Sequence, residues 1–253
     1  MLKVRVIPVL LLKSGRLVKT IGFGSPKYVG DPINAVRIFN GKNVDELIVL
    51  DIAATIEKKK PDMKMISLLT SECFRPICYG GGISSLEEIK EILSTGAEKV
   101  VINTRANMNP SFVLEASERF GNQSIVISID IKKEKSGAYD VFTHAGTRPI
   151  SKDPVSLAVQ MEKMGCGEII VNSIDRDGTM QGYDIELLKR VSAVVTVPVV
   201  ACGGAGSLAN LKEAVEVGGA SAVAAGSMFV LYGKYRAPLI QYPTRQELDD
   251  IFL

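Results

Sequence analysis

A strand-like run that ends in a cluster of glycines occurs twice in this sequence, about half a chain apart. The first copy, residues 76–85, reads PICYGGGISS, and the second, residues 198–207, reads PVVACGGAGS. Each copy leads into a helical pattern and then into another short apolar run. Because only glycine lets a backbone approach an anion closely, a strand that ends in glycines at a helix N-terminus is typical of a phosphate site. The repeat therefore predicts two such sites in a duplicated fold.

Short runs rich in valine and isoleucine alternate with amphipathic segments along the whole chain. Strands are expected at residues 4–12, 47–52, 76–79, 100–102, 125–131, 169–172, 198–201 and 222–225, with a small extra strand at 139–143. Helices are expected from Asp31-Pro32 onwards and at residues 61–72, 84–94, 110–119, 153–164, 185–194, 208–217 and 244–252. This alternation predicts parallel βαβ units.

Two arrangements fit eight such units, one closed and one open. A (β/α)8 TIM barrel carries its functional groups on the loops after each strand, whereas a doubly wound open sheet binds ligands at a crevice. The half-chain repeat favours the barrel. We therefore predict an α/β fold, a single (β/α)8 barrel over residues 1–253 with a half-barrel internal repeat.

Charge and hydropathy exclude several classes of protein. The formal net charge is +2 and the lysines and acidic residues are interspersed, which argues against a nucleic-acid groove and makes no case for a membrane surface. The first twelve residues resemble a leader peptide, but Lys13 interrupts the apolar run and no small-residue cleavage site follows. No apolar run is long enough to span a bilayer. We expect a cytoplasmic protein.

Cysteine and histidine usage restricts the possible cofactors. Cys73, Cys78, Cys166 and Cys202 lie far apart without the spacing of a metal or redox motif, so we expect buried free thiols. His144 is the only histidine, which excludes any site that needs two imidazoles. We expect neither a metal nor another cofactor.

The two halves of the repeat differ at one chemically important position. Residues 9–13 align with residues 128–132, and Leu11 stands where the second half has Asp130. In a barrel both positions lie at the end of a strand, on the face that carries functional groups. The sequence therefore predicts one central carboxylate instead of two.

Several segments resemble the cyclase subunit of imidazole glycerol phosphate synthase, and the resemblance covers nearly the whole chain. They are residues 5–15, 47–54, 80–82, 127–130, 173–179 and 203–206. In that family two phosphate sites hold a substrate with a phosphate at each end. The resemblance implies a phosphorylated small-molecule ligand, held by Gly82, Asn103 and Thr104 at one end and by Asp177, Gly178, Gly204, Gly226 and Ser227 at the other. Lys19 matches the lysine of the family's mobile first loop.

The resemblance also implies an incomplete catalytic pair. The family cyclises its substrate with two aspartates, as general acid and general base, at the ends of strands one and five. Asp130 matches one of them, and the other falls on Leu11. General acid–base catalysis typically contributes ~10²–10⁴-fold, so we expect a strongly impaired cyclase if the reaction needs both groups.

A further set of matches concerns ammonia delivery. The family takes ammonia from a partner glutaminase at the N-terminal barrel face, through a channel gated by a ring of charged residues. Arg5, Glu46, Lys99 and Glu168 match that ring, and their alternating charges could pair across the barrel mouth.

The chain thus keeps the residues that match the ammonia gate and lacks one catalytic carboxylate. In this combination it resembles the branch of the family that is associated with glycosyl amidation in lipopolysaccharide (O-antigen) biosynthesis. Residues 9–15, 25–28, 73–80 and 236–243 are similar to that branch. The resemblance implies a synthase-like barrel that passes ammonia from a glutaminase to an ATP-dependent sugar amidotransferase. Two alternatives stay open: an authentic histidine-pathway cyclase that tolerates Leu11, and a non-catalytic scaffold that activates the glutaminase.

Overall fold

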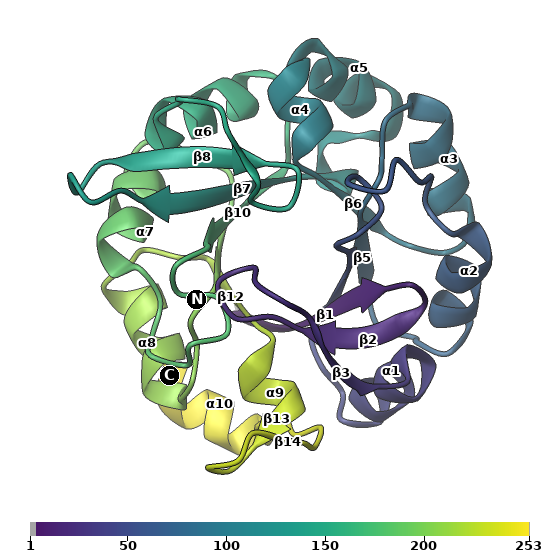
Figure 1. Ribbon diagram of the computed structural model, residues 1–253, viewed down its shortest axis with the longest axis vertical. Coiled ribbons are helices and arrows are strands. Elements are labelled where there is room, and N and C mark those ends of the chain that lie inside the picture. Colours follow the sequence, from purple (N-terminus) through teal and green to yellow (C-terminus); the bar gives the residue numbers. More distant parts are fainter. Residues whose placement is uncertain (1–3, 253) are drawn as a thin grey trace.

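A closed ring of parallel strands forms the centre of the molecule (Figure 1). The computed structural model describes residues 4–252, so the first three residues of the stretch weighed above as a leader lie outside it. Within this range the ring consists of β1 (Arg5–Lys13), β4 (Leu47–Asp51), β5 (Ile77–Gly80), β6 (Lys99–Ile102), β7 (Ile125–Lys133), β10 (Glu168–Ser173), β11 (Val199–Cys202) and β12 (Ala222–Ala225).

Parallel pairing runs once around this ring. Strand β1 pairs with β4 on one side and with β12 on the other, and β7 pairs with β10 to close the second half. The predicted (β/α)8 barrel is therefore confirmed, and the open sheet is excluded. The register places Asn172 beside Asp130 and Leu11 beside Leu50, which brings the strand ends together at one face.

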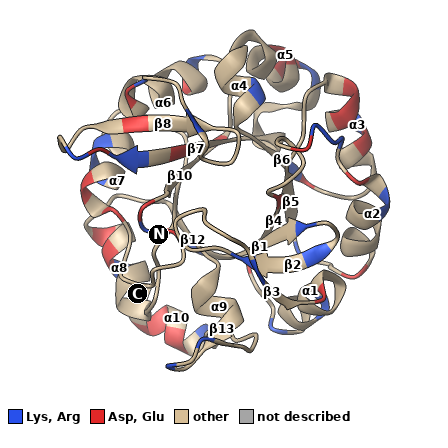
Figure 2. Cartoon of the chain, viewed as in Figure 1, with Lys and Arg blue, Asp and Glu red and all other residues tan. Residues whose placement is uncertain are grey.

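Helices surround the strands (Figure 1). They are α1 (Pro32–Gly41), α2 (Met63–Ser71), α3 (Leu86–Ser94), α4 (Thr104–Met108), α5 (Ser111–Phe120), α6 (Pro154–Lys163), α7 (Ile185–Ser192), α8 (Leu208–Glu216), α9 (Ser227–Val230) and α10 (Arg245–Phe252), with one 3-10 turn, Asn122–Ser124. Aspartate or serine side chains cap most of the longer helices, as Asp31 does for α1. Positively and negatively charged residues are interspersed along this outer layer (Figure 2).

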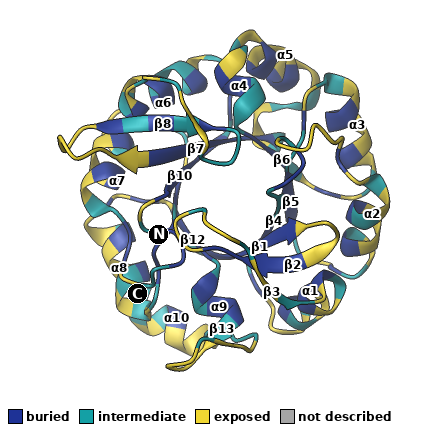
Figure 3. Ribbon diagram, viewed as in Figure 1, coloured by how far each residue is buried: buried dark blue, intermediate teal, exposed yellow. Residues whose placement is uncertain are grey.

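Two apolar layers account for the fold. The strand faces that point outwards pack with the inner helix faces, so the buried positions concentrate at that boundary while the outer helix faces are exposed (Figure 3). The strand faces that point inwards form a separate cluster that fills the barrel: Ile7, Val9, Leu11, Val18, Ile48, Cys78, Val101, Val126, Ile170, Val200, Ala222 and Ala224. Alternation of side chains along each strand produces both layers from one sequence pattern.

The structure adds elements that the sequence pattern did not predict. The first loop contains two strands, β2 (Arg16–Lys19) and β3 (Lys27–Gly30), and β2 pairs antiparallel with the end of β1. Strand β8 (Tyr139–Thr143) was expected, and it pairs with β7 and with β9 (Arg148–Pro149). A hairpin of β13 (Leu231–Tyr232) and β14 (Ala237–Pro238) follows α9. The short helices α4 and α9 follow β6 and β12, at equivalent places in the two halves.

Candidate active site

A cavity of about 330 Å³ opens at the carboxyl ends of the barrel strands. Every residue expected in catalysis, in phosphate binding or as the first-loop lysine lines this one cavity: Leu11, Lys19, Gly82, Asn103, Thr104, Asp130, Asp177, Gly178, Gly204, Gly226 and Ser227. They come from segments more than 200 residues apart in the chain. The barrel register brings them together, as expected for the loop face of this fold.

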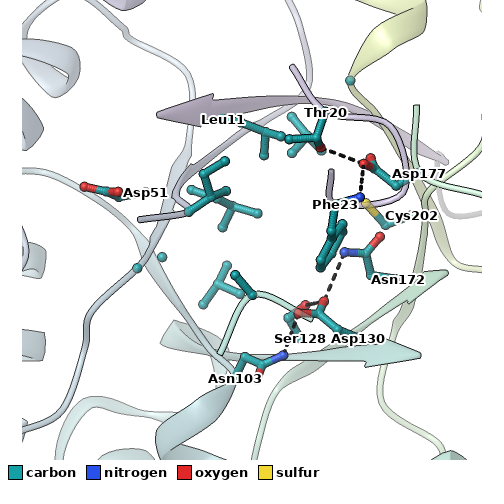
Figure 4. A pocket seen from close by; sticks show the side chains of 18 of the residues that line it. Leu11, Thr20, Phe23, Asp51, Asn103, Ser128, Asp130, Asn172, Asp177 and Cys202 are labelled. Carbon is teal, nitrogen blue, oxygen red and sulfur yellow. Dashed lines mark hydrogen bonds between the residues drawn. The ribbon is translucent and has the colours of Figure 1, made fainter. Parts of the chain in front are cut away.

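Asp130 lies in the wall of the cavity and is 9% exposed (Figure 4). One carboxylate oxygen, Oδ1, accepts hydrogen bonds from Asn172 Nδ2 at 3.0 Å and from Ser128 Oγ at 3.3 Å. The other, Oδ2, accepts one from Asn103 Nδ2 at 2.9 Å. Three neighbouring strand ends therefore hold both oxygens in fixed positions.

The environment of Asp130 suits proton transfer near neutral pH. Burial raises its pKa to about 6, against the hydrogen bonds from Asn172 and Ser128, which stabilise the ionised form, and with a small contribution from the negative charge of Asp177. A carboxyl group whose pKa lies this close to the working pH can both accept and donate a proton. These properties agree with the expected role of Asp130 in proton transfer, which stays a prediction.

Leu11 lies across the cavity from Asp130, at the end of β1 (Figure 4). It is 8% exposed and packs in the inner cluster with Val9 and Val18, with Leu50 against it. An aliphatic side chain here can exclude water but cannot transfer a proton. The predicted asymmetry of the two barrel halves is therefore present in the cavity wall.

A second carboxylate in the wall, Asp51, does not replace the missing one. Its Oδ1 accepts hydrogen bonds from the backbone N–H groups of Ala53 at 3.0 Å and Ala54 at 3.2 Å, so it fixes the turn after β4. Burial raises its pKa, and the two backbone hydrogen bonds oppose that shift. Figure 4 shows its carboxylate turned away from Asp130.

The first predicted phosphate site lies between the ends of β5 and β6. Asn103 precedes α4, and its side-chain Oδ1 is buried without a hydrogen-bond partner among the described residues. The Thr104 hydroxyl accepts a hydrogen bond of 3.1 Å from the backbone N–H of His144. Gly82 has a left-handed φ of +72°, and a Cβ there would collide with the carbonyl of Lys59. The packing of the chain thus already requires glycine at position 82, and phosphate binding stays a prediction.

The second predicted phosphate site lies between the ends of β11 and β12. Gly226 precedes α9, and the hydroxyl of Ser227 is buried without a partner in the described range. Lys19 was expected on a mobile loop, but it ends strand β2 and is 6% exposed. Its Nζ occupies the space that a Cβ at Gly226 would need. The structure therefore places a buried lysine side chain at this site.

The charge state of Lys19 depends on its neighbours. Burial lowers its pKa, and the negative charges of Asp177 and of an ionised Cys202 would act in the opposite direction. A phosphate bound beside Gly226 would add a much larger charge of the same sign and stabilise the ammonium form. A bound anion would therefore raise the pKa of Lys19.

Asp177 and Gly178 line the cavity and also hold the first loop in place. The Asp177 carboxylate accepts a hydrogen bond from Thr20 Oγ1 at 2.7 Å and a longer one from the backbone N–H of Phe23 at 3.4 Å. Gly178 makes room for the carbonyl of Thr20. The backbone N–H of Gly22 adds a bond of 2.9 Å to the Asp177 carbonyl. These contacts fix the first loop against the turn that carries Asp177 and Gly178, and phosphate binding by these two residues stays a prediction.

Phe23 is a cavity residue that sequence reasoning missed. Its ring points into the cavity towards Asp130 and Asn172 (Figure 4). Gly146, in the turn between β8 and β9, leaves the space that this ring fills, because a Cβ there would meet the ring. The loops after β1 and β8 therefore meet over the cavity.

Two hydrogen-bond partners of Asp130, Ser128 and Asn172, were also missed, although the sequence held a signal for them. Ser128 lies two residues before Asp130, so both side chains point to the same face of β7. Asn172 ends the predicted sixth strand, which must neighbour the fifth in a barrel.

The four cysteines are all free, as expected. Cys202 was expected in the core, but it lies half-buried in the cavity wall, whereas the other three cysteines are buried.

The predicted charged ring lies at the opposite end of the barrel. Arg5 pairs with both Glu46 and Glu168, and Lys99 Nζ lies 3.0 Å from Glu46 Oε1 and 2.9 Å from Glu168 Oε2. Arg5, Lys99 and Glu168 each begin a strand and Glu46 directly precedes β4. Together the four residues form a closed circuit of alternating charge. Ion pairing raises the pKa of Arg5 and Lys99 against the effect of burial. The expected pairing across the barrel mouth is therefore present.

Between the ring and Asp130 the barrel interior is apolar. Cys78, which lies in the inner cluster, is close enough to the ring for all four charges to act on its thiol.

In the described residues no group of three or more potential metal ligands occurs. No helix within residues 4–252 is long and apolar enough to cross a membrane.

The similarity of this chain to known proteins shows its family. The family described as histidine biosynthesis protein matches residues 5–236. The chain belongs to this family. A protein of Pseudomonas aeruginosa, provisionally named as an imidazole glycerol phosphate synthase subunit, is 52% identical over 249 residues, 98% of this chain and 99% of that protein.

Two further relatives carry similar provisional names. The Leptospira interrogans protein is 48% identical over 253 residues, which cover all of both chains. The Vibrio vulnificus protein is 45% identical over 248 residues, 98% of this chain and 95% of the relative. These names agree with the resemblance to the cyclase subunit of imidazole glycerol phosphate synthase, and none of them mentions lipopolysaccharide.

Proposed function

We propose that this protein is the synthase barrel of a glutamine amidotransferase of the imidazole glycerol phosphate synthase type. In this proposal a separate glutaminase docks at the N-terminal face, and its ammonia crosses the barrel to the cavity around Asp130. The observation that carries the proposal is the arrangement of one closed charged ring, one apolar interior and one acid–base carboxylate within a single barrel.

The apolar interior favours neutral ammonia over ammonium. Moving a charged ammonium into a low-dielectric interior without a partner is costly, whereas a neutral amine loses far less solvation energy. The ring of Arg5, Glu46, Lys99 and Glu168 would have to open transiently for ammonia to enter. Its two cations and two anions can exchange partners within the circuit, so opening one pair leaves each charge with another.

At the far end Asp130 would accept a proton from the attacking nitrogen. With its pKa at about 6 most Asp130 is ionised at neutral pH and can act as a base. A leaving group on the other side of the ligand would need a proton, and Leu11 cannot supply it. Cyclisation by this barrel therefore depends on Asp130 alone or on a proton from solvent.

Two acceptors of ammonia fit the site. The names of the relatives and the paired glycine sites support the bis-phosphorylated substrate of the cyclase, and with it a histidine-pathway enzyme that tolerates Leu11. Leu11 itself supports the second candidate, in which ammonia passes on to a sugar amidotransferase that converts an acetamido group to an acetamidino group for lipopolysaccharide. The free cysteines fit a reducing compartment, and we place either reaction in the cytoplasm.

The decisive experiment supplies purified barrel with the bis-phosphorylated formimino ribulosyl substrate and excess ammonium salt. Ammonium bypasses the glutaminase and isolates the chemistry of the barrel. Turnover of ~1 s⁻¹ or more would establish the cyclase and show that Leu11 is tolerated. Binding without turnover would support transfer of ammonia to another enzyme. Failure of the barrel to increase glutaminase activity would refute the proposal as a whole.

A further inference from the structure

One exposed aromatic side chain at the N-terminal end of the barrel has no role in the chemistry above. Phe74 is 90% exposed and lies between α2 and β5. Segments that lead into barrel strands lie at the same end as the strand starts, which here carry the charged ring. Of the other large apolar side chains in residues 4–252, Tyr235 alone is as exposed.

The segment that carries Phe74 is held rigidly. The backbone N–H of Phe74 donates a hydrogen bond of 3.0 Å to Asn40 Oδ1 at the end of α1. The Arg75 guanidinium donates one of 2.5 Å to Asn43 Oδ1, and the Cys73 thiol contacts the Arg75 carbonyl at 3.5 Å. An aromatic ring on a fixed backbone loses little conformational entropy when a partner covers it.

The same segment is continuous with the charged ring. The carbonyl of Pro76 accepts a hydrogen bond of 2.9 Å from the backbone N–H of Leu47, the residue after Glu46. Burial raises the pKa of the Asp45 carboxyl, and the positive charges of Arg5 and Arg75 both oppose that shift, so Arg75 lies near the rim of the ring. A partner that covered the ring would therefore also reach Phe74 and Arg75.

A single exposed apolar residue needs no explanation by itself. Phe74 differs because it is fixed, flanked by an arginine and adjacent to the entrance of the barrel. Aromatic and arginine side chains are the groups that most often dominate the binding energy of protein interfaces. We propose that Phe74 is the apolar anchor for the glutaminase, seated in an apolar recess of that partner, with Arg75 facing a carboxylate at its rim. This inference rests on the proposed function.

The test compares glutaminase binding to the full-length barrel and three variants by isothermal titration calorimetry, with the purified glutaminase subunit encoded by the same genome. Phe74→Ala is expected to raise Kd at least about tenfold, mainly through faster dissociation. Phe74→Leu keeps an apolar side chain and should retain a large part of the affinity. Tyr235→Ala is the matched control, because it removes an equally exposed aromatic ring from the hairpin at the other end of the barrel.

The outcomes separate the two proposals. If the wild-type barrel binds glutaminase and Phe74→Ala binds within about twofold of it, the anchor is refuted while the proposed function stands. If the wild-type barrel does not bind glutaminase at all, both are lost. Analytical ultracentrifugation of the barrel alone tests whether a second copy of the chain binds this surface instead. A dimer that is lost in Phe74→Ala and kept in Tyr235→Ala would assign the surface to that second copy and refute the anchor.

Discussion

Asn172 donates a 3.0 Å hydrogen bond from its side-chain amide to Asp130 Oδ1, across the parallel pair β7–β10. This bond favours the ionised carboxylate, whereas burial favours the protonated one. The balance leaves Asp130 with a pKa of about 6, in the range where a carboxyl group transfers protons in both directions.

Asn172→Leu is expected to raise the pKa of Asp130 further, because the ionised form loses a donor. If Asp130 acts as a base, the ammonium-dependent rate should then fall at neutral pH and recover at higher pH. A pH–rate profile measures this shift, with Asp130→Asn as the inactive reference, expected to lose ~10²–10⁴-fold. If the acidic side of the pH–rate profile of Asn172→Leu matches that of wild type, a group other than Asp130 determines the pH dependence.

Asp130 should also make stability depend on pH. A carboxyl group has a pKa of about 3.9 in the unfolded chain, and here it is about 6 in the folded state. The native state therefore binds the proton more tightly, and the unfolding free energy should fall as pH rises from about 4 to 6, by roughly 2–3 kcal/mol.

Chemical denaturation of wild type and Asp130→Asn across that range checks this contribution. The difference between the two curves isolates Asp130, since the other titrating groups are shared. A difference that did not change with pH would mean that Asp130 keeps an ordinary pKa.

Leu11→Asp tests whether the lost carboxylate explains a weak cyclase. The new side chain would face Asp130 from an aliphatic wall, where burial raises the pKa of a carboxyl group. We expect a gain of tenfold or more in ammonium-dependent cyclisation and a loss of roughly 1–3 kcal/mol in stability. Leu11→Asn has the same shape without the proton and should show only the loss. Equal rates for both variants would count against the carboxylate.

Glu168→Gln should open the charged ring by removing one of its two anions. Arg5 and Lys99 would each lose one of two ion pairs, and their side chains are 29% and 19% exposed, so water compensates in part. A stability loss of roughly 1–3 kcal/mol is expected. If the ring controls ammonia entry, the glutamine-dependent rate should change while the ammonium-dependent rate does not. A parallel change in both rates would point to a purely structural ring.

Thr20→Val should release the first loop from Asp177, because it replaces a hydroxyl donor by a methyl group of similar size. Hydrogen exchange at residues 20–26 should become faster, and the rest of the barrel should not change. Thr20→Ser keeps the donor and serves as the control. Unchanged exchange in Thr20→Val would mean that Phe23, packed against Gly146, holds the loop without the hydrogen bond.

Much of the fold and part of the site followed from local sequence patterns. Hydrophobic periodicity identified the strands and most helices, because burial of one face imposes the same repeat on every element of its type. The glycine clusters located both ends of the cavity. The alignment of the two halves showed, without any structure, that Leu11 stands at the position equivalent to Asp130. This was possible because the two halves of a duplicated chain can be compared with each other.

Only the tertiary structure decided how these groups act on one another. Burial by the closed barrel raises the pKa of Asp130, and the hydrogen bond from Asn172, which reaches it from a neighbouring strand, opposes that shift. The sequence placed Lys19 on a loop, whereas strand pairing buries it beside Gly226, 207 positions away. The circuit at the barrel mouth likewise joins Arg5 to Glu168, 163 positions apart. Such contacts depend on strand register and closure, which are set by packing across the whole barrel and leave no local signal in the chain.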